Sequence, residues 1–166
     1  MKRIAHIGLA ASLLVTLAAA PASARSAGPT IVETAIAVNG ATGEFDSLIA
    51  AVVRADLATT LDGKRQFTVF APTDAAFERL FEALGVSGVD EIPVDTLRAV
   101  LLDHVAPGER MSGDVLAASR IRTVGKDFLV PSIAAGVPYI DGARIVIPDV
   151  DASNGVIHVI DAVLLP

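Results

Sequence analysis

The sequence predicts an α+β domain, because helical patterns concentrate in its first two thirds and strand patterns in its last third. Up to about residue 105, apolar residues recur at i, i+3, i+4 and i+7, which is the spacing of one helix face. From Ile121 onward, short β-branched segments alternate with Gly- and Asp-containing turns. A chain of 166 residues that is 52% hydrophobic has enough material for one domain with a substantial core.

The first 24 residues are typical of a signal peptide. Met1-Lys2-Arg3 is positively charged, residues 4–20 are almost entirely apolar, and Ala22-Ser23-Ala24 forms an A-x-A cleavage site. An uncleaved membrane anchor is the alternative. We expect cleavage that leaves residues 25–29 as a short linker and residues 30–166 as the domain, secreted or periplasmic, with no stable membrane span.

The charge balance excludes several classes of partner. Removal of Lys2 and Arg3 with the leader leaves 11 of the 13 basic residues against 19 acidic ones, a net charge of -8. An acidic chain without a basic cluster interleaved with aromatic residues is a poor ligand for nucleic acid or for an anionic membrane surface. The sequence contains no cysteine, so disulfides and thiolate chemistry are excluded.

The domain begins with two predicted helices. Thr30 and Glu33 have the spacing of a capping box, and residues 39–43 are expected to form a loop. A second helix is indicated by an apolar stripe that ends before the turn at Asp62-Gly63: Phe45, Leu48, Ile49, Val52 and Val53.

The spacing of apolar residues changes in the middle of residues 66–84, from a strand pattern to a helix pattern. Residues 66–70 favour a strand, and Pro72 ends it because proline has no backbone N–H to donate. Thr73 or Asp74 can cap a following helix, which should stop at Gly85. The apolar stripe of that helix is Phe77, Leu80, Phe81 and Leu84.

A further helix is predicted before Pro107-Gly108. Its stripe consists of Leu97, Val100, Leu101, His104 and Val105, so His104 lies on the apolar face and Asp103 points elsewhere. A short helix is expected after Ser112-Gly113-Asp114.

The remainder of the chain is expected to form strands. Residues 121–124 pair with 128–130, and residues 139–140 pair with 144–147 around Asp141-Gly142. Residues 148–154 are expected to be a loop. Residues 156–165 are apolar at both parities, which predicts a central strand covered on both faces.

Three segments carry a resemblance to a known family. TVFAPTDAAFERL resembles the first signature of the fasciclin (FAS1, beta-Ig-h3) domain, and residues 154–166 resemble the second. Residues 101–108 are similar to the Tyr-His segment between them. The resemblance covers roughly residues 30–166 and implies a β-wedge of two sheets with helices packed around it and the two signature strands close together. The matching motif residues are Thr73, Asp74, Phe77, Asp103, His104, Asn154, Gly155, His158 and Asp161.

Residues that could carry chemistry favour structural roles. We interpret His104 as a core histidine, and the hypothesis for its partner is the Thr73-Asp74 corner. His158 and Asp161 have opposite parity on one strand, so they are not an adjacent acid–base pair. Residues 149–155 only faintly resemble a calcium loop, no G-x-S-x-G occurs, and no facing carboxylate pair is evident. We therefore expect no enzyme activity, no metal and no cofactor.

The family resemblance implies an extracellular adhesion or protein-interaction module. Asp103 occupies the position of the family's tyrosine, which argues against an integrin-type role, and no Arg-Gly-Asp is present. The expected partner is a protein or glycan of the cell surface, envelope or matrix. The alternative is a carrier of a carotenoid or another apolar ligand. We predict a core that contains Val69, Phe70, Phe77, Leu80, Phe81, Val100, Leu101, Val159 and Ile160.

Overall fold

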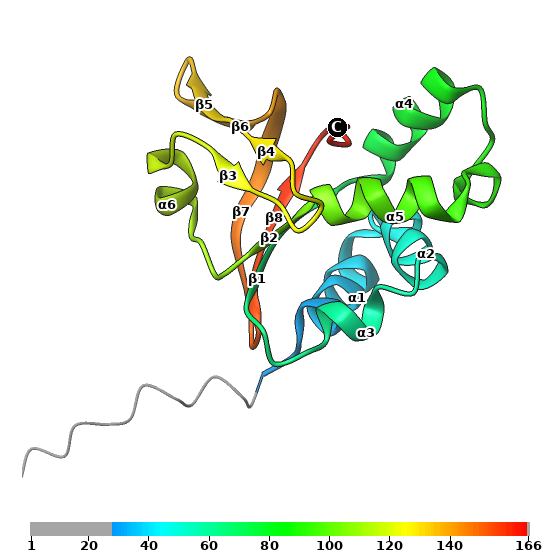
Figure 1. The fold of residues 1–166 in the computed structure, drawn as a ribbon, viewed down its shortest axis with the longest axis horizontal. Helices are drawn as coiled ribbons and strands as arrows, with labels where there is room; N and C mark the ends of the chain where they lie inside the picture. The colour runs from blue at the N-terminus through cyan, green and yellow to red at the C-terminus, as the bar shows by residue number, and fades with distance from the viewer. Residues whose placement is uncertain (1–27, 166) are drawn as a thin grey trace, which may run out of the picture.

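The computed structural model describes residues 28–165, so the predicted signal peptide and most of the predicted linker lie outside the described residues. Figure 1 shows α1 to α5 on one side of the central strands β1 and β8, and α6 with the outer strands on the other side. The helices are α1 (Ile31–Thr42), α2 (Asp46–Arg54), α3 (Ala58–Leu61), α4 (Asp74–Leu84), the 3-10 turn η1 (Val89–Glu91), α5 (Val94–Asp103) and α6 (Ser112–Ala117).

The strands form a curled mixed sheet and a small second sheet. The larger sheet has the order β2-β1-β8-β7-β6-β5, and β3 pairs with β4 in the other. The strands are β1 (Phe67–Pro72), β2 (Val105–Pro107), β3 (Ile121–Arg122), β4 (Phe128–Leu129), β5 (Pro131–Ala134), β6 (Val137–Ile140), β7 (Ala143–Ala152) and β8 (Gly155–Ile160). The α+β class and the FAS1 arrangement expected from the sequence are confirmed.

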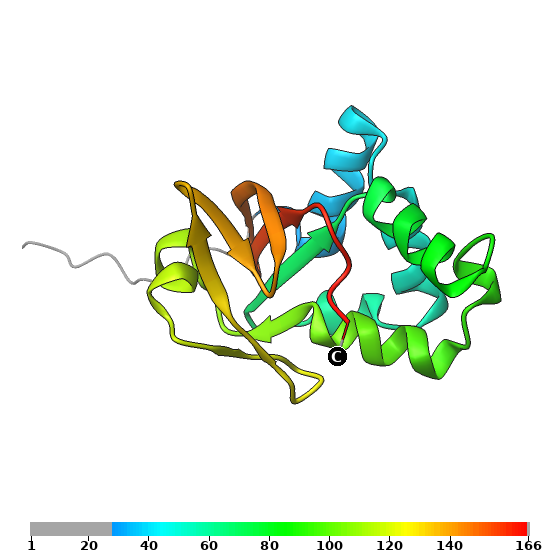
Figure 2. The same cartoon turned by 90° about the horizontal axis from the view of Figure 1, so that it is seen from above.

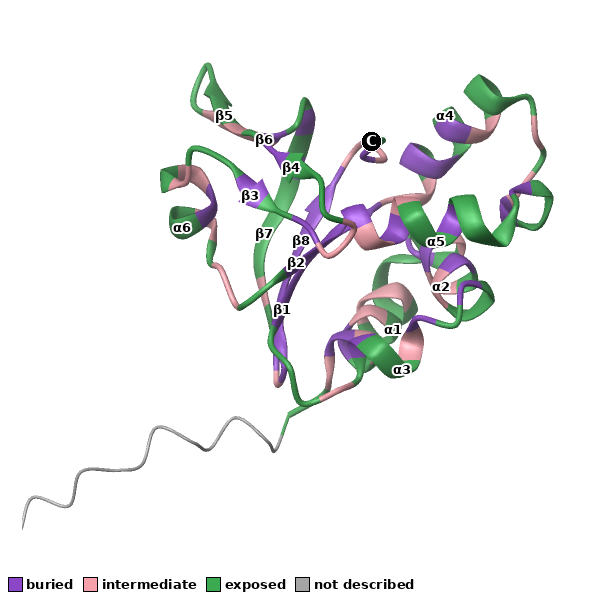
Figure 3. Cartoon of the chain, viewed as in Figure 1, coloured by how far each residue is buried: buried purple, intermediate pink, exposed green. Residues whose placement is uncertain are grey.

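The centre of the molecule is the parallel pair β1 and β8, which run in register from Phe67↔Gly155 to Pro72↔Ile160. Every residue of both strands is buried. One face of the pair, with Val69 and Val159, belongs to the core beneath the helices. The other face, with Phe70 and Ile160, belongs to a second core under α6, β3 and β4. The purple strands in the middle of Figure 3 are this pair.

Several local predictions are confirmed. Thr30 and Glu33 form the capping box of α1, and Gly85 ends α4 in the left-handed region at φ 69°. The β6–β7 hairpin turns at Asp141 and Gly142, with φ of 47° and 83°. Positive φ at both positions matches the right-handed twist of paired strands, which is why Asp-Gly is a strong hairpin signal.

Other predictions are wrong at element boundaries. Residues 39–42 belong to α1, which continues to a left-handed Gly43. The segment 148–152, predicted as part of a loop, lies within β7, which accommodates Pro148 through β-bulges and a positive φ of 59° at Asp149. Val105 starts strand β2 instead of extending the helix, because α5 ends at Asp103.

Most of the predicted core is buried, with exceptions at the edges of helix stripes. Phe81 and Val100 are half-buried, and Val53 and Leu84 are exposed. The buried members are Val69, Phe70, Phe77, Leu80, Leu101, Val159 and Ile160. A periodic stripe is wider than the strip of helix that a neighbouring element covers, so its outermost positions remain in solvent.

Candidate functional site

The motif residues converge on the ends of the β1–β8 pair, where they hold the elements together. Figure 2 shows the last segment running from β8 to the C-terminal end of α5. At that point the Leu164 backbone amide donates to His104 Nε2 at 2.9 Å, and His104 Nδ1 lies 2.7 Å from the Val100 carbonyl oxygen. Because Nε2 accepts, Nδ1 carries the proton and donates.

This geometry keeps His104 neutral. Complete burial lowers the pKa of its imidazole to about 4 and outweighs the opposing hydrogen bond to Val100. The hypothesis that the Thr73-Asp74 corner contacts His104 is wrong, since both ring nitrogens are occupied by backbone groups of other residues. His104 therefore connects the final segment to α5.

The Thr73-Asp74 corner has a different task. Thr73 is the N-cap of α4, but its side chain makes no capping hydrogen bond. The Asp74 carboxylate instead accepts from the Ser47 amide at 2.7 Å and the Asp46 amide at 3.2 Å, the first amides of α2. A carboxylate at free helix amides is favourable. Asp74 thereby caps the neighbouring helix, which has no cap of its own at Phe45.

The Asn154-Gly155 corner anchors the other end of the central pair. The Asn154 side chain accepts from the Ile31 amide at 2.8 Å and donates to the Leu61 and Gly63 carbonyl oxygens at 2.6 and 3.2 Å. A Cβ on Gly155 would overlap the Phe67 carbonyl oxygen of the paired strand, and φ here is +154°. Only glycine permits this approach of β8 to β1.

His158 is also a buried connection. Its ring stacks on Phe70 with centroids 5.6 Å apart, Nδ1 accepts from the Asp149 amide at 3.1 Å, and Nε2 lies 3.0 Å from the Arg110 carbonyl oxygen. Burial lowers its pKa. Asp161 lies apart from this group, and its carboxylate accepts from the Arg144 amide at 2.9 Å.

Ser112, Asp149 and His158 lie together, but not in a catalytic order. The Ser112 hydroxyl donates to Asp149, whose other carboxylate oxygen is 4.0 Å from His158 Nδ1. Nucleophilic catalysis needs the imidazole between the hydroxyl and the acid. Although burial alone would raise the pKa of Asp149, the hydrogen bonds from Ser112 lower it. Within residues 28–165, no group of three acidic or histidine side chains could hold a metal ion.

Asp103, predicted to point away from the apolar face, is itself buried at the C-terminal end of α5. Its carboxylate accepts from the Thr123 hydroxyl at 3.0 Å. Asp103 and His104 are both below 5% exposed, so the segment similar to the family's Tyr-His motif presents no side chain of these two residues to a partner.

Two surface features were not predicted from the sequence. Phe128, Val130 and Ile133 are exposed within six residues of β4 and β5, and Arg120 lies 4.5 Å above the Phe128 ring. An apolar cavity of about 70 Å³ lies between α1, α2 and α3 and the β1–β8 pair, with exposed Ile36 and Val53 among its lining residues. The sequence signal for exposed side chains was that residues 131–134 of β5 show no clear alternation of apolar and polar residues. Only the packing reveals which apolar residues stay exposed.

Comparison with known proteins identifies the family. The sequence matches the fasciclin domain over residues 43–166, and the chain belongs to this family. It is 36% identical to the uncharacterized protein sll1735 of Synechocystis, over 82% of this chain and 98% of that protein, and 38% identical to protein sll1483 of the same organism, over 74% and 67%.

Animal relatives are more distant and longer. The chain is 33% identical to the transforming growth factor-beta-induced protein ig-h3 of Sus scrofa over 74% of its own length but only 18% of that protein. Among solved structures, a FAS1 domain pair from the insect cell adhesion molecule fasciclin I superimposes with a TM-score of 0.67 at 20% identity, covering 83% of this chain and 51% of that one. This similarity shows the fold, in a family that includes cell adhesion proteins. Within residues 28–165, no helix has the length and hydropathy to cross a bilayer.

Proposed function

We propose that this chain is an exported, non-enzymatic module of the cell envelope or surface, which binds an acidic protein or glycan through its outer strands. The observation that carries the proposal is the set of exposed apolar side chains in the segment from β4 to β5, with two arginines next to Phe128. We call Arg120, Arg122, Phe128, Val130 and Ile133 the outer-strand surface.

The exposure of these residues is the first support. Phe128 is 48% exposed, Val130 52% and Ile133 61%, although each belongs to or adjoins a strand. Single exposed apolar residues are ordinary on a protein surface, whereas three within six consecutive positions of the chain mark a candidate interaction segment. Arginine stacked on an aromatic ring, as Arg120 is on Phe128, is enriched in interfaces.

The distribution of charge is the second support. Residues 30–103 carry twelve acidic and five basic side chains, whereas residues 119–147 carry four basic and two acidic ones. The acidic total of the chain thus conceals a basic region around the outer-strand surface. Complementary charge steers association and favours an acidic partner for this side of the domain.

We propose a non-enzymatic role for the chain because the polar side chains of the motifs are hydrogen-bonded to backbone groups. His104 and His158 each have both ring nitrogens hydrogen-bonded and are buried. A general base must reach a substrate proton, which buried imidazoles with both nitrogens occupied do not do.

The test is capture of a partner from an envelope extract of the producing cell with the immobilised mature chain. The variant is Phe128→Ser combined with Ile133→Ser, and the matched control is Leu84→Ser, an exposed leucine at the end of α4. We expect the double variant to lose the captured partner, the control to retain it, and capture to weaken as salt is raised. Equal capture by wild type and double variant would reject the outer-strand surface as the site.

The apolar cavity supports a second candidate function, carriage of a small apolar ligand. Its lining is almost wholly aliphatic and includes Ile31, Leu48, Ile49, Val52, Leu61 and Ile157. At about 70 Å³ it is well below the roughly 300 Å³ at which ligand pockets begin, so a polyene would require α1 and α2 to separate. Visible absorbance of the protein purified from its native source would favour this function over adhesion, whereas a colourless protein would count against pigment carriage.

A further inference from the structure

The two edges of the six-stranded sheet differ in how they are covered. β2 forms one edge, and there the Val124 amide donates to the Val105 carbonyl oxygen at 2.7 Å. β5 forms the other edge. Although α6 packs against β5, Ser132, Ile133 and Ala134 are all exposed. The β5 edge is therefore open to solvent where the β2 edge is occupied.

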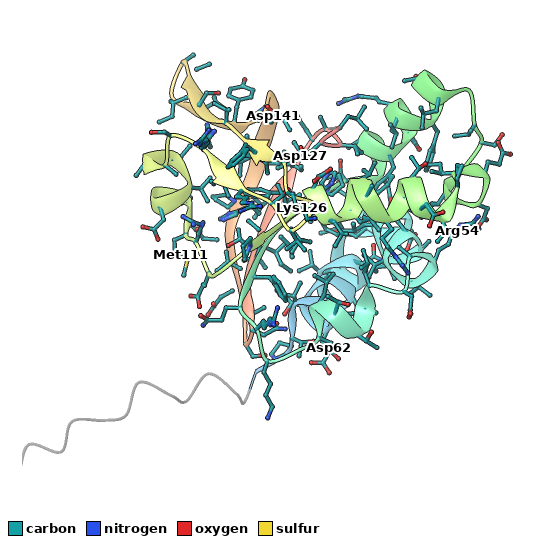
Figure 4. The ribbon with its side chains drawn as sticks, in the orientation of Figure 1. Arg54, Asp62, Met111, Lys126, Asp127 and Asp141 are labelled. Carbon is teal, nitrogen blue, oxygen red and sulfur yellow. The ribbon has the colours of Figure 1, made fainter. Side chains whose placement is uncertain are left out.

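The pairing of β5 with β6 fixes the direction of the backbone groups at this edge. The Asp141 amide donates to the Val130 carbonyl oxygen at 2.9 Å, so these two residues are a hydrogen-bonded pair; Figure 4 labels Asp141 at this end of the hairpin. Opposed residues of antiparallel strands alternate between hydrogen-bonded and non-hydrogen-bonded pairs. Ile133 and Pro138, three positions along, are then a non-hydrogen-bonded pair, which a proline fits because no N–H is needed there.

Backbone groups of β5 consequently point away from β6 on the open side. They are the Ile133 amide, the Ile133 carbonyl and, two positions earlier, the Pro131 carbonyl. Within residues 28–165, no backbone hydrogen bond from outside the ladder reaches these groups. An unpaired edge of this kind can pair with a further strand, and β5 carries no charged side chain to prevent it.

The charge of this region favours an acidic occupant. Residues 119–147 carry four basic and two acidic side chains, so a second copy of the chain would bring two basic regions together. Ser132, Tyr139 and Arg144 are opposed across β5, β6 and β7, which places their side chains on one face of the sheet. The exposed Arg144 thus lies on a face that a strand added at β5 would extend.

We propose that β5 accepts an extended acidic peptide segment of the partner as a further strand of the sheet. Amides of the segment donate to the Pro131 and Ile133 carbonyl oxygens, and a carbonyl of the segment accepts from the Ile133 amide. The Ile133 side chain, which is 61% exposed, adds an apolar contact beside the new strand. The inference rests on the proposed function, and it adds the conformation of the partner segment and the backbone groups that bind it.

The first test uses a capped heptapeptide of alternating glutamate and valine as the probe, titrated into the isotope-labelled mature chain and followed by NMR. We expect a saturable shift of the Ile133 amide, with hydrogen exchange there slowed about tenfold when the peptide exceeds its Kd about tenfold, and no change at β8 amides. Lysine in place of glutamate should weaken binding about tenfold. The same acidic peptide methylated at its peptide nitrogens cannot donate and should not bind. Equal shifts with the methylated peptide, or no shift at Ile133, would overturn strand addition.

The second test compares two variants in the capture from envelope extract. Ile133→Pro removes the amide but keeps an apolar side chain at an edge position that tolerates proline, and Ile133→Val is the matched control. We expect Ile133→Val to retain the captured partner and Ile133→Pro to lose it about tenfold. A thermal melt checks that Ile133→Pro folds, and if it does not, the peptide titration of the wild type decides.

The outcomes separate this inference from the proposed function. Full capture by Ile133→Pro, with loss by the variant that combines Phe128→Ser and Ile133→Ser, would reject strand addition and leave the outer-strand surface as the site. Full capture by both would reject the surface itself. A dimer that forms with rising protein concentration and is lost in Ile133→Pro would assign the edge to a second copy and overturn the acidic segment.

Discussion

The central strands and the outer strands of this domain contain similar apolar residues but differ in how far those residues are buried. β1 and β8 consist almost entirely of apolar side chains that are buried on both faces of the pair. Each face of the pair packs against a separate core. Phe128 of β4, Ile133 of β5 and Val130 between the two strands are also apolar, but these side chains remain in solvent. The position of a strand in the sheet, and not its composition alone, decides whether an apolar side chain stabilises the fold or is available to a partner.

The largest effect should follow from closing the space between the central strands. Gly155→Ala places a Cβ against the Phe67 carbonyl oxygen at a left-handed φ, so we expect a loss of about 4 kcal/mol or more, or failure to fold. Urea unfolding measures it. Gly113→Ala, at a helical glycine with no heavy atom within 4 Å of the added Cβ, is the control and should be neutral or slightly stabilising. Similar stability of the two variants would contradict the role of Gly155.

Replacing each of the two α4 phenylalanines with alanine compares the stability cost at a fully buried position with that at a half-buried one. Phe77 is 1% exposed, so Phe77→Ala should lower the free energy of unfolding by about 3–5 kcal/mol. Phe81, whose ring centre is 5.9 Å from that of Phe77, is half-buried, and Phe81→Ala should cost roughly half as much. Thermal or urea unfolding of both variants checks the order, and an equal cost would show that the outer position is covered more fully than we infer.

Acid should lower the stability of the domain through its two buried histidines, His104 at the end of α5 and His158 in β8. The folded-state pKa of His104 is about 4 and the ordinary value is 6.5, so the unfolded chain binds the proton first as the pH falls. Stability should decrease from about pH 6.5 to about pH 4 by about 3 kcal/mol, and the lowered pKa of His158 adds to this loss. Urea unfolding at several pH values measures this loss. An Asp103→Asn background removes a buried carboxyl whose raised pKa would act in the opposite direction. Constant or rising stability over that interval would be inconsistent with neutral buried imidazoles.

A smaller effect is expected where α4 caps α2. Asp74→Ala removes the acceptor of the Asp46 and Ser47 amides and should cost about 1–2 kcal/mol. Glu78→Ala, an exposed acid on the same helix, is the control and should change stability by less than about 0.5 kcal/mol. Chemical unfolding distinguishes them, and equal effects would remove Asp74 from the list of structural anchors.

The smallest effect belongs to the outer strands. Ile133 is 61% exposed on β5, so Ile133→Ser should change the free energy of unfolding by no more than about 0.5 kcal/mol. A thermal melt of this variant beside Val159→Ser, a buried position of β8, contrasts the two regions directly. A large loss of stability at Ile133 would mean that β5 is covered in solution, and would remove it from the outer-strand surface.

Local sequence rules predicted the elements better than their partners. Residues 66–84 predict strand, corner and helix because proline ends the ladder and the apolar period changes from two to 3.6. The same rules suggested that Asp74 caps its own helix, whereas it caps α2 twenty-seven residues earlier in the chain. A carboxylate next to a helix start predicts an acceptor for free amide groups. Which of the nearby helix N-termini it caps depends on how the helices pack.

The motifs of the sequence determined the family, and local patterns determined the capping box at Thr30 and the glycines at Gly85 and Gly142, because these features depend on local conformation. The closeness of the two signature strands was implied by the family resemblance, and the structure shows that they pair in parallel. The tertiary structure alone decided that His104 bonds to Leu164, that Asp103 is buried against Gly125, and that Phe128, Val130 and Ile133 stay uncovered. These outcomes join residues up to 60 positions apart or depend on which face another element covers. Burial and hydrogen-bond partnership are properties of the assembled layers, so no local pattern specifies them.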